Sequence, residues 1–324
     1  MDLQLKKKIS GKHAALPPGL KWFIPHLRIT FHHLNLNIQL TMRMSGFLFT
    51  YFLTAMLGCA PGEPPAPKID PSQQKPVDKN WAFETTPVWA DEFDYEGPPD
   101  PNKWDYDIGG HGWGNNELQY YTNDIKNASV SGGLLKITVL KEKKENREYT
   151  STRLVSRNKG DWLYGRIEIS AKLPTGKGTW PALWMLPTDW AYGDWPKSGE
   201  IDIMEHVGFD QNRVHFSVHT ESYNHMIGTQ RTATQIIETA SDAFHKYRVD
   251  WTPYAVRGFF DDQQVFEFVN EGKGPATWPF DKRFHLLINI AFGGNWGGAQ
   301  GIDDSILPQS MLVDYVRVYK MIEK

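Results

Sequence analysis

Short runs in which hydrophobic and polar residues alternate dominate the chain from Trp81 to its end. Because successive side chains of a strand point to opposite faces, such runs predict strands with one buried face. The clearest runs span residues 134–139, 164–170, 213–218, 247–251, 264–268 and 312–319. The pattern shows no long amphipathic helix and no internal repeat. We therefore expect one all-β domain over residues 81–324, a β-jelly-roll sandwich of two antiparallel sheets with a concave cleft.

In one run, carboxylates rather than uncharged polar residues alternate with apolar side chains. Glu200 and Asp202 share one face of this strand, although Asp and Glu are depleted in strands. Strict alternation would send Glu205 into the core as an unpaired charge. One extra residue near Met204, forming a β-bulge, would return Glu205 to the acidic face, and bulges are common beside active sites. The sequence therefore predicts a bulged strand that carries three carboxylates in a row.

Such a row of acids suits acid–base and nucleophilic chemistry. Neighbouring carboxylates repel, so one keeps its proton toward neutral pH while another stays ionised. This is the pair that retaining glycoside hydrolysis uses, with carboxyl groups about 5–5.5 Å apart. Two alternatives are a surface strand with scattered acids and a metal site. No Lys or Arg occurs between Gly199 and Gly208 to break up the acids, and calcium loops usually contain Asn, Gly and Asp.

The acidic run also resembles a known signature. Residues 200–205, Glu-Ile-Asp-Ile-Met-Glu, together with residues 180–185, Trp-Pro-Ala-Leu-Trp-Met, resemble glycoside hydrolase family 16 in its bulged form, which is typical of laminarinases, agarases and carrageenases. The resemblance extends over residues 88–320 and implies the jelly-roll architecture. It implies that Glu200 is the nucleophile, Glu205 the acid/base and Asp202 an assisting residue. It also implies retaining endo-hydrolysis of a β-glucan without a redox or organic cofactor.

The segment 112–122 narrows the expected substrate, because it resembles a laminarinase segment more than an agarase or carrageenase one. This favours β-1,3-glucan of the laminarin type. Amides both donate and accept hydrogen bonds, as sugar hydroxyls require, so we expect Asn115 or Asn116 to contact the glycone-side sugar. A turn in which the asparagines are purely conformational is the alternative. By resemblance, Arg153 is expected in the cleft, although a solvent-facing arginine is nearly as plausible.

Tryptophans and one histidine complete the expected binding residues. Trp180 and Trp184 lie four residues apart and share one strand face, where indoles would stack on the apolar faces of sugar rings. Core packing is the alternative, and it is stronger for one of the two than for both. By resemblance, His219 is expected to reach the aglycone-side sugar. Glycines surround Trp296, which predicts a loop at the rim of the cleft where that indole stacks.

A structural calcium ion is expected only from the resemblance. Relatives bind this ion through an acid near the first strand, a loop carbonyl and an Asp of the last strand. The corresponding residues are Glu92, Gly133 and Asp314, all of which offer the oxygen ligands that Ca²⁺ prefers. Pairing of Asp314 with a surface base is an equally good interpretation.

The first 80 residues contain no predicted strand. Residues 1–41 lack a coherent pattern, and we expect translation to start at Met42 or Met44, with residues 1–41 an upstream extension. Residues 42–59 are expected to be a lipoprotein signal peptide, since a short apolar run ends in a sequence that resembles a lipobox with Cys59 as the lipidated residue. Residues 60–80 are Pro-rich and predict a tether. We therefore expect a lipid-anchored protein of the bacterial cell envelope, in the outer membrane and facing the periplasm or the exterior, or otherwise a secreted one.

Composition limits the partners. With 40% hydrophobic residues the chain has an ample core, and its net charge of -3 gives no field for nucleic acid. Cys59 is the single cysteine, so an intramolecular disulfide is excluded. We expect a monomer that binds a polysaccharide and attaches to a membrane only through its lipid. A mixed-linkage β-1,3-1,4-glucanase, an agarase-type galactanase and a non-catalytic carbohydrate-binding lipoprotein remain alternatives.

Overall fold

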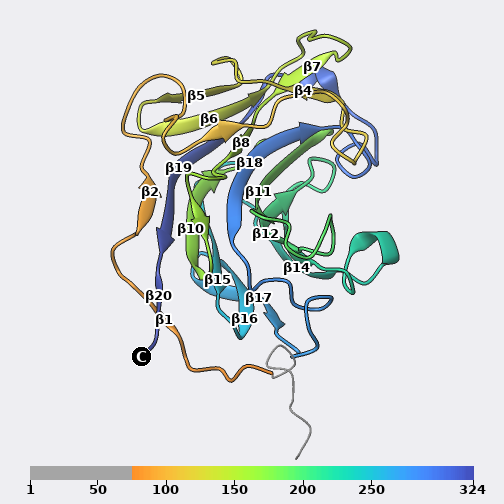
Figure 1. Cartoon of the computed structure of the whole chain (residues 1–324). Helices are drawn as coiled ribbons and strands as arrows, with labels where there is room; N and C mark the ends of the chain where they lie inside the picture. Colours follow the sequence, from red (N-terminus) through yellow and green to blue (C-terminus); the bar gives the residue numbers. More distant parts are fainter. Residues whose placement is uncertain (1–74) are drawn as a thin grey trace, which may run out of the picture. The chain divides into compact units, whose positions relative to one another are not determined.

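The computed structural model describes residues 75–324, and almost every element in it is a β-strand (Figure 1). Sheet 1 has the order β17-β16-β15-β10-β19-β6-β5, with β2 also paired to β19. These strands are β17 (Gln263–Val269), β16 (Ala255–Phe260), β15 (His245–Trp251), β10 (Gly165–Lys172), β19 (Gln309–Tyr319), β6 (Leu134–Val139), β5 (Ala128–Ser131) and β2 (Trp89–Asp91).

Sheet 2 has the order β14-β13-β12-β11-β18-β8-β3, with β9 also paired to β18. Its strands are β14 (Arg231–Ile236), β13 (Arg213–His219), β12 (Glu200–His206), β11 (Thr179–Pro187), β18 (Phe284–Phe292), β8 (Arg153–Val155), β3 (Asp105–Tyr106) and β9 (Asp161–Trp162). Two small sheets pair β1 (Ala82–Phe83) with β20 (Met321–Ile322) and β4 (Gln119–Tyr121) with β7 (Tyr149–Ser151). Two 3₁₀ turns, η2 (His225–Ile227) and η3 (Asp304–Ile306), complete the described part.

Each of the six runs predicted from alternation falls on one strand, with only Tyr164 outside it, and every pairing within sheets 1 and 2 is antiparallel. The predicted all-β sandwich is therefore confirmed. The expectations for residues 1–74, including the lipid anchor at Cys59, lie outside the described residues. Residues 75–324 include no helix with the length and apolar character needed to span a membrane.

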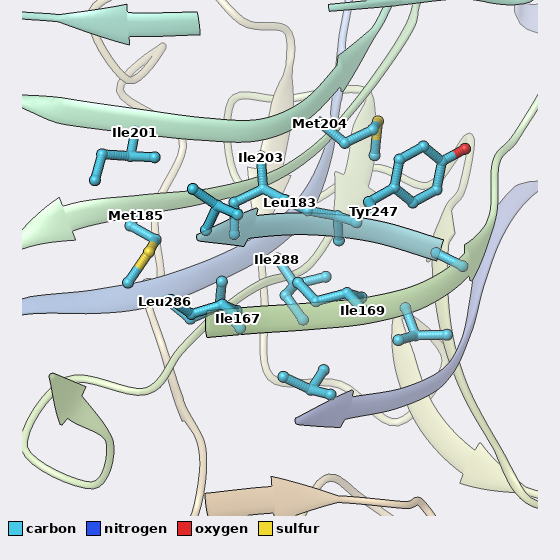
Figure 2. Close-up of a cluster of buried hydrophobic side chains, with 14 of the residues drawn as sticks. Ile167, Ile169, Leu183, Met185, Ile201, Ile203, Met204, Tyr247, Leu286 and Ile288 are labelled. Carbon is cyan, nitrogen blue, oxygen red and sulfur yellow. The ribbon is translucent and has the colours of Figure 1, made fainter. Parts of the chain in front are cut away.

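The core lies between the two sheets and is built from the inward side chains of alternating strands (Figure 2). Sheet 2 contributes Ile201 and Ile203 of β12 and Leu183 of β11, while sheet 1 contributes Ile167 and Ile169 of β10. All five side chains are buried, and each such burial contributes about 1.5–3 kcal/mol to folding. This apolar face fixes sheet 2, so the opposite face of the same strands can carry polar chemistry.

Strand β12 contains the predicted bulge. Asp202 lies opposite Ser217 and Glu205 lies opposite His215, so three steps along β12 match two steps along β13. The extra residue lets Ile203 and Met204 both face the core, where both are buried. The alternation consequently resumes with Glu205 on the same face as Asp202.

Candidate active site

A cavity of about 520 Å³ opens on the face of sheet 2 that points away from the core. All three acids of β12 line it, and so do side chains from β11, β18 and β8. The lining also includes His111, Trp113, Asn115, Glu117, Tyr121, Arg153, Trp180, Trp184, Trp190, Trp195, His225, Met226 and Asn289. The cavity is therefore an aromatic cleft with a small number of acids at its centre, as carbohydrate sites require.

Glu200 is the first residue of β12, and its position depends on the glycine before it. Gly199 has a φ of +87°, and a Cβ there would lie 2.7 Å from Cγ of Pro279, so no other residue fits without strain. The loop before this glycine brings Trp195 back over the strand. Its indole Nε1 donates a hydrogen bond of 2.9 Å to Oε2 of Glu200. The carboxylate is thereby fixed by a donor that stabilises its ionised form.

Asp202 lies between the two glutamates along β12 and is buried. Its Oδ2 lies 3.3 Å from Nε2 of His219, and the same ring nitrogen lies 3.9 Å from Oε1 of Glu200. The neighbouring Asp202 raises the pKa of the Glu200 carboxyl. Asp202 thus influences the charge of its neighbour.

Glu205 receives a hydrogen bond from the neighbouring strand. The indole Nε1 of Trp180 donates to Oε1 of Glu205 over 3.1 Å. The loop after β18 supports this indole, since a Cβ on Gly297 would lie 2.9 Å from Cβ of Trp180. Trp296 of the same loop packs edge-on against Trp180, with ring centroids 5.5 Å apart. The position of Glu205 therefore depends on β11 and on the glycine-rich loop.

Burial raises the pKa of all three carboxyl groups. Repulsion adds to this effect, because Asp202 raises the pKa of Glu200, Glu200 that of Glu205, and Glu205 that of Asp202. The cluster therefore holds fewer than three negative charges near neutral pH. At least one carboxyl group can then donate a proton while another stays ionised and acts as a nucleophile.

One wall of the cleft consists of a cation between two indoles. The guanidinium carbon of Arg153 lies 4.8 Å from the ring centroid of Trp113 and 4.7 Å from that of Trp184. Its Nε lies 3.1 Å from Oδ2 of Asp107, which keeps the side chain in place. The expectation that Arg153 lies in the cleft is consistent with this arrangement, because its side chain lines the cavity.

A chain of hydrogen bonds supports the same wall from behind. Trp184 Nε1 donates to Oδ1 of Asn289 over 2.7 Å, and Asn289 Nδ2 donates to the Tyr121 hydroxyl over 3.1 Å. That hydroxyl donates to Oε2 of Glu117, which also accepts a 2.6 Å bond from Gln119. Burial raises the pKa of Glu117, the largest effect on that group. The network fixes the indole of Trp184 as a rigid surface for a sugar ring.

The other residues expected to bind substrate divide into two groups. Asn115 lines the cavity, as do Trp180 and Trp184 with Ala182 between them. Asn116 instead donates to Oδ1 of Asn295 over 2.8 Å and is absent from the lining. His219 is buried opposite Glu200 on the neighbouring strand and Trp296 packs edge-on against Trp180, but neither of them is among the residues that line the cavity. Their expected contacts with a sugar remain predictions.

Sequence reasoning missed Trp195, Glu117 and His225. Trp195 and His225 lie in loops without periodicity, so alternation gives no signal for them. The high tryptophan content, with 13 Trp in the chain, indicated extra aromatic surfaces but not which residues form them. Glu117 lies inside the segment 112–122, in which only the asparagines were predicted to bind a sugar.

The expected calcium ligands lie on or near sheet 1. Both carboxylate oxygens of Glu92 accept hydrogen bonds from Arg317, at 2.8 and 2.7 Å, so Glu92 is engaged by a cation. Asp314 is exposed at the register shift of β19, and Gly133 lies in the turn between β5 and β6. Within residues 75–324, the one group of three His, Cys, Asp or Glu residues close enough to hold an ion is Glu200, Asp202 and His219. This group coincides with the acids of the cleft.

Comparisons with known proteins agree with this geometry. Residues 113–317 match the family model of glycosyl hydrolases family 16. The β-glucanase of Rhodothermus marinus is 50% identical over 296 residues, which cover 89% of this chain and 98% of that protein. The X-ray structure of the laminarinase from Rhodothermus marinus has a TM-score of 0.73 at 54% identity and covers 75% of this chain and 99% of its own.

A further solved relative carries a sugar. SCLam, described as a non-specific endo-β-1,3(4)-glucanase from family 16, has a TM-score of 0.71 at 42% identity and covers 74% of this chain and 96% of its own. That structure is of a mutant that was co-crystallised with 1,3-β-D-cellotriosyl-glucose and presents a 1,3-β-D-cellobiosyl-glucose at its active site. The matched family model spans well over half of the present chain and includes all three acids of β12. The chain therefore belongs to glycosyl hydrolase family 16 and is a glycoside hydrolase.

Proposed function

We propose that this protein hydrolyses internal β-1,3 linkages of a laminarin-type glucan with net retention of configuration. The observation that carries the proposal is the bulge of β12, which brings Glu205 into the same cavity as Glu200. Two carboxyl groups on one strand face suit the short separation that retaining enzymes use. Indoles line the cavity and offer flat apolar surfaces for the sugar rings of a glucan chain.

In the first step Glu200 attacks the anomeric carbon, and the bond from that carbon to the glycosidic oxygen breaks. Glu205 transfers its proton to this leaving oxygen, which becomes the hydroxyl of the released sugar. In the second step a water molecule gives its proton to Glu205 while its oxygen bonds to the anomeric carbon. The bond from the anomeric carbon to Glu200 breaks as this new bond forms, so Glu200 leaves as a carboxylate and the enzyme returns to its starting state. Asp202 assists Glu200 by acting on its pKa, and the His219 ring nitrogen lies close to both acids.

The relatives support the choice of substrate. The similar protein from Rhodothermus marinus is called a β-glucanase and its solved counterpart a laminarinase. SCLam is called a non-specific endo-β-1,3(4)-glucanase. This favours a mixed-linkage β-1,3-1,4-glucanase as the second candidate. An agarase-type galactanase and a non-catalytic binding protein are less well supported.

The test is a panel of laminarin, lichenan and agarose assayed with wild-type enzyme and the variants Glu200→Ser and Glu205→Ser. We expect reducing ends to be released fastest from laminarin and both variants to lose at least about 100-fold in kcat. The matched control is Glu267→Ser, which removes a glutamate from β17 in sheet 1. Near-normal turnover by either active-site variant would contradict the assigned roles, and a preference for lichenan would favour the second candidate.

We further propose that Cys59 carries a lipid and attaches the enzyme to the bacterial cell envelope. The support is the lipobox-like sequence Met56-Leu57-Gly58-Cys59 after an apolar run. Labelled fatty acid should be incorporated into the full chain and not into Cys59→Ser. Incorporation into both proteins, or into neither, would contradict the anchor.

A structural calcium ion bound by the Gly133 carbonyl and Asp314 remains a proposal. Glu92 would take part only after release from Arg317, so we expect it to contribute little. Calcium should raise the Tm of the wild-type enzyme relative to a chelator and have no effect on Asp314→Asn. An equal response of both proteins would exclude this site.

A further inference from the structure

The segment between β13 and β14 forms a short loop at one end of the cleft. It contains the 3₁₀ turn η2 and projects beside β14 (Figure 1). In sheet 2, β13 and β14 lie on one side of β12, whereas β18 and β8 lie on the other side, with the wall of Arg153 and Trp184. The loop therefore borders the end of the cleft that is opposite to that wall.

A buried asparagine makes this loop rigid. Asn224 Nδ2 donates to the carbonyls of Thr220 and Glu221 over 3.0 and 3.1 Å, and its Oδ1 accepts from the backbone N–H of Met226 over 3.1 Å. The N–H of Thr229 donates to the Asn224 carbonyl over 3.0 Å. The side chains carried by η2 are thus held in place without a substrate.

The turn presents His225 and Met226 to the cavity, which both of them line. His225 packs between two partners of the catalytic acids, with its ring centroid 5.1 Å from that of Trp195 and 5.3 Å from that of His219. Met226 follows it and is 73% exposed. Met226 therefore places a large apolar side chain, open to solvent, on the wall of the catalytic cavity.

We propose that Met226 is a binding surface for the apolar face of a sugar on the leaving-group side, beyond the sugar that accepts the proton from Glu205. This inference rests on the proposed function and on the expectation, implied by the family resemblance, that the leaving-group sugar binds on the side of the cleft near His219. The thioether side chain is unbranched and polarisable, so it adapts to the C–H face of a pyranose ring. The rigid loop limits the entropy lost when the sugar binds.

The next residue of the same turn provides a matched control. Ile227 is 60% exposed and apolar, but it does not line the cavity. We would compare Met226→Ser, Met226→Leu and Ile227→Ser on two substrates. Laminarihexaose places sugars on both sides of the broken bond, whereas 4-nitrophenyl β-laminaribioside has an aryl leaving group and no sugar on that side.

With Met226→Ser we expect kcat/KM for laminarihexaose to fall about fivefold to tenfold, and that for the aryl glycoside to stay within about twofold. The preferred position of cleavage along the hexaose should shift, because the leaving-group side binds less tightly. Met226→Leu should restore the wild-type values, and Ile227→Ser should leave both substrates unchanged.

Equal losses on the two substrates would contradict the inference, since Met226 would then act on the chemistry or on the other side of the cleft. A Met226→Ser enzyme indistinguishable from Ile227→Ser would contradict it as well, while leaving the proposed function intact. A wild-type enzyme inactive on laminarihexaose would instead overturn the proposed function, and this inference with it.

Discussion

The indole nitrogen of Trp180 lies 3.1 Å from Oε1 of Glu205 and donates a hydrogen bond to it. Trp195 has the same relationship to Glu200, over 2.9 Å. Each of the two acids assigned to the chemistry therefore receives one N–H from a tryptophan that also forms part of the cleft wall. An N–H donor favours the ionised form of a carboxyl group, so both tryptophans lower the pKa that burial raises.

Replacing Trp180 by Phe removes the donor but keeps an aromatic ring. The pKa of Glu205 should rise, and because Glu205 must be protonated to act as the acid, the alkaline limb of the kcat/KM profile should move to higher pH. We expect kcat to fall about tenfold or more, since a hydrogen bond to a charged group contributes about 1.5–3 kcal/mol. An unchanged alkaline limb in pH–rate measurements would show that the indole does not control this proton.

Trp195→Phe should affect the opposite limb. Glu200 must be ionised to attack, and loss of the donor should raise its pKa, so activity should disappear at a higher pH as the solution is acidified. Asp202, His219 and Trp195 are the groups that shift the pKa of Glu200 beside the effect of burial, and the variant changes just one of them. A shift of the alkaline limb alone would argue against the assignment of Glu200 as nucleophile.

Azide should distinguish the roles of the two glutamates. In Glu205→Ala the glycosyl-enzyme still forms from a substrate with a good leaving group, and azide can attack it without a general base, so the glycosyl azide should retain the β configuration. In Glu200→Ala azide replaces the missing nucleophile and should give the inverted α product. NMR spectra of the azides would check this, and the reverse pattern would exchange the two roles.

Arg153→Lys should weaken substrate binding more than it slows the chemistry. Lysine keeps the charge but cannot stack a planar group between Trp113 and Trp184. We expect KM for laminarin to rise about threefold to tenfold, the effect of roughly 0.7–1.4 kcal/mol, with kcat changed little. A large fall in kcat at unchanged KM would place Arg153 in the chemical step instead.

Acid should destabilise the fold through His206. This side chain is buried, its Nε2 accepts an N–H from Asn212 over 3.2 Å, and burial lowers its pKa to about 4. In the unfolded chain this imidazole takes up a proton near pH 6.5, so its contribution to the free energy of unfolding is complete above that pH. About 3 kcal/mol of that free energy is lost as the pH falls toward 4. Urea unfolding at pH 7 and pH 4 should show a smaller loss for His206→Gln. Equal losses in both proteins would assign the acid sensitivity elsewhere.

The sequence predicted what depends on local periodicity. Alternation identified the strands, and the break in alternation after Asp202 predicted the bulge, because burial of Glu205 as an unpaired charge would be costly. The same reasoning placed Trp180 and Trp184 on one face, and both line the cavity.

Contacts made by loops could not be predicted in this way. Trp195 reaches Glu200 because the segment before Gly199 folds back over β12, and no residue spacing encodes that path. Asn115 and Asn116 are chemically identical neighbours, yet only Asn115 lines the cavity, while Asn116 binds Asn295 from a loop far away in the sequence. Side-chain direction in such segments depends on tertiary packing rather than on a period.

Two consecutive residues of β12, Ile203 and Met204, point into the hydrophobic core. Because of them, the reaction rate depends on how the core is packed. Both side chains are anchored among the apolar groups of the opposite sheet, and the backbone between them sets where the next carboxyl group emerges. A change of volume at either position, made without touching a single polar atom, would therefore shift the proton donor relative to the scissile oxygen. Engineering for heat resistance that repacks this spot would alter turnover as a side effect.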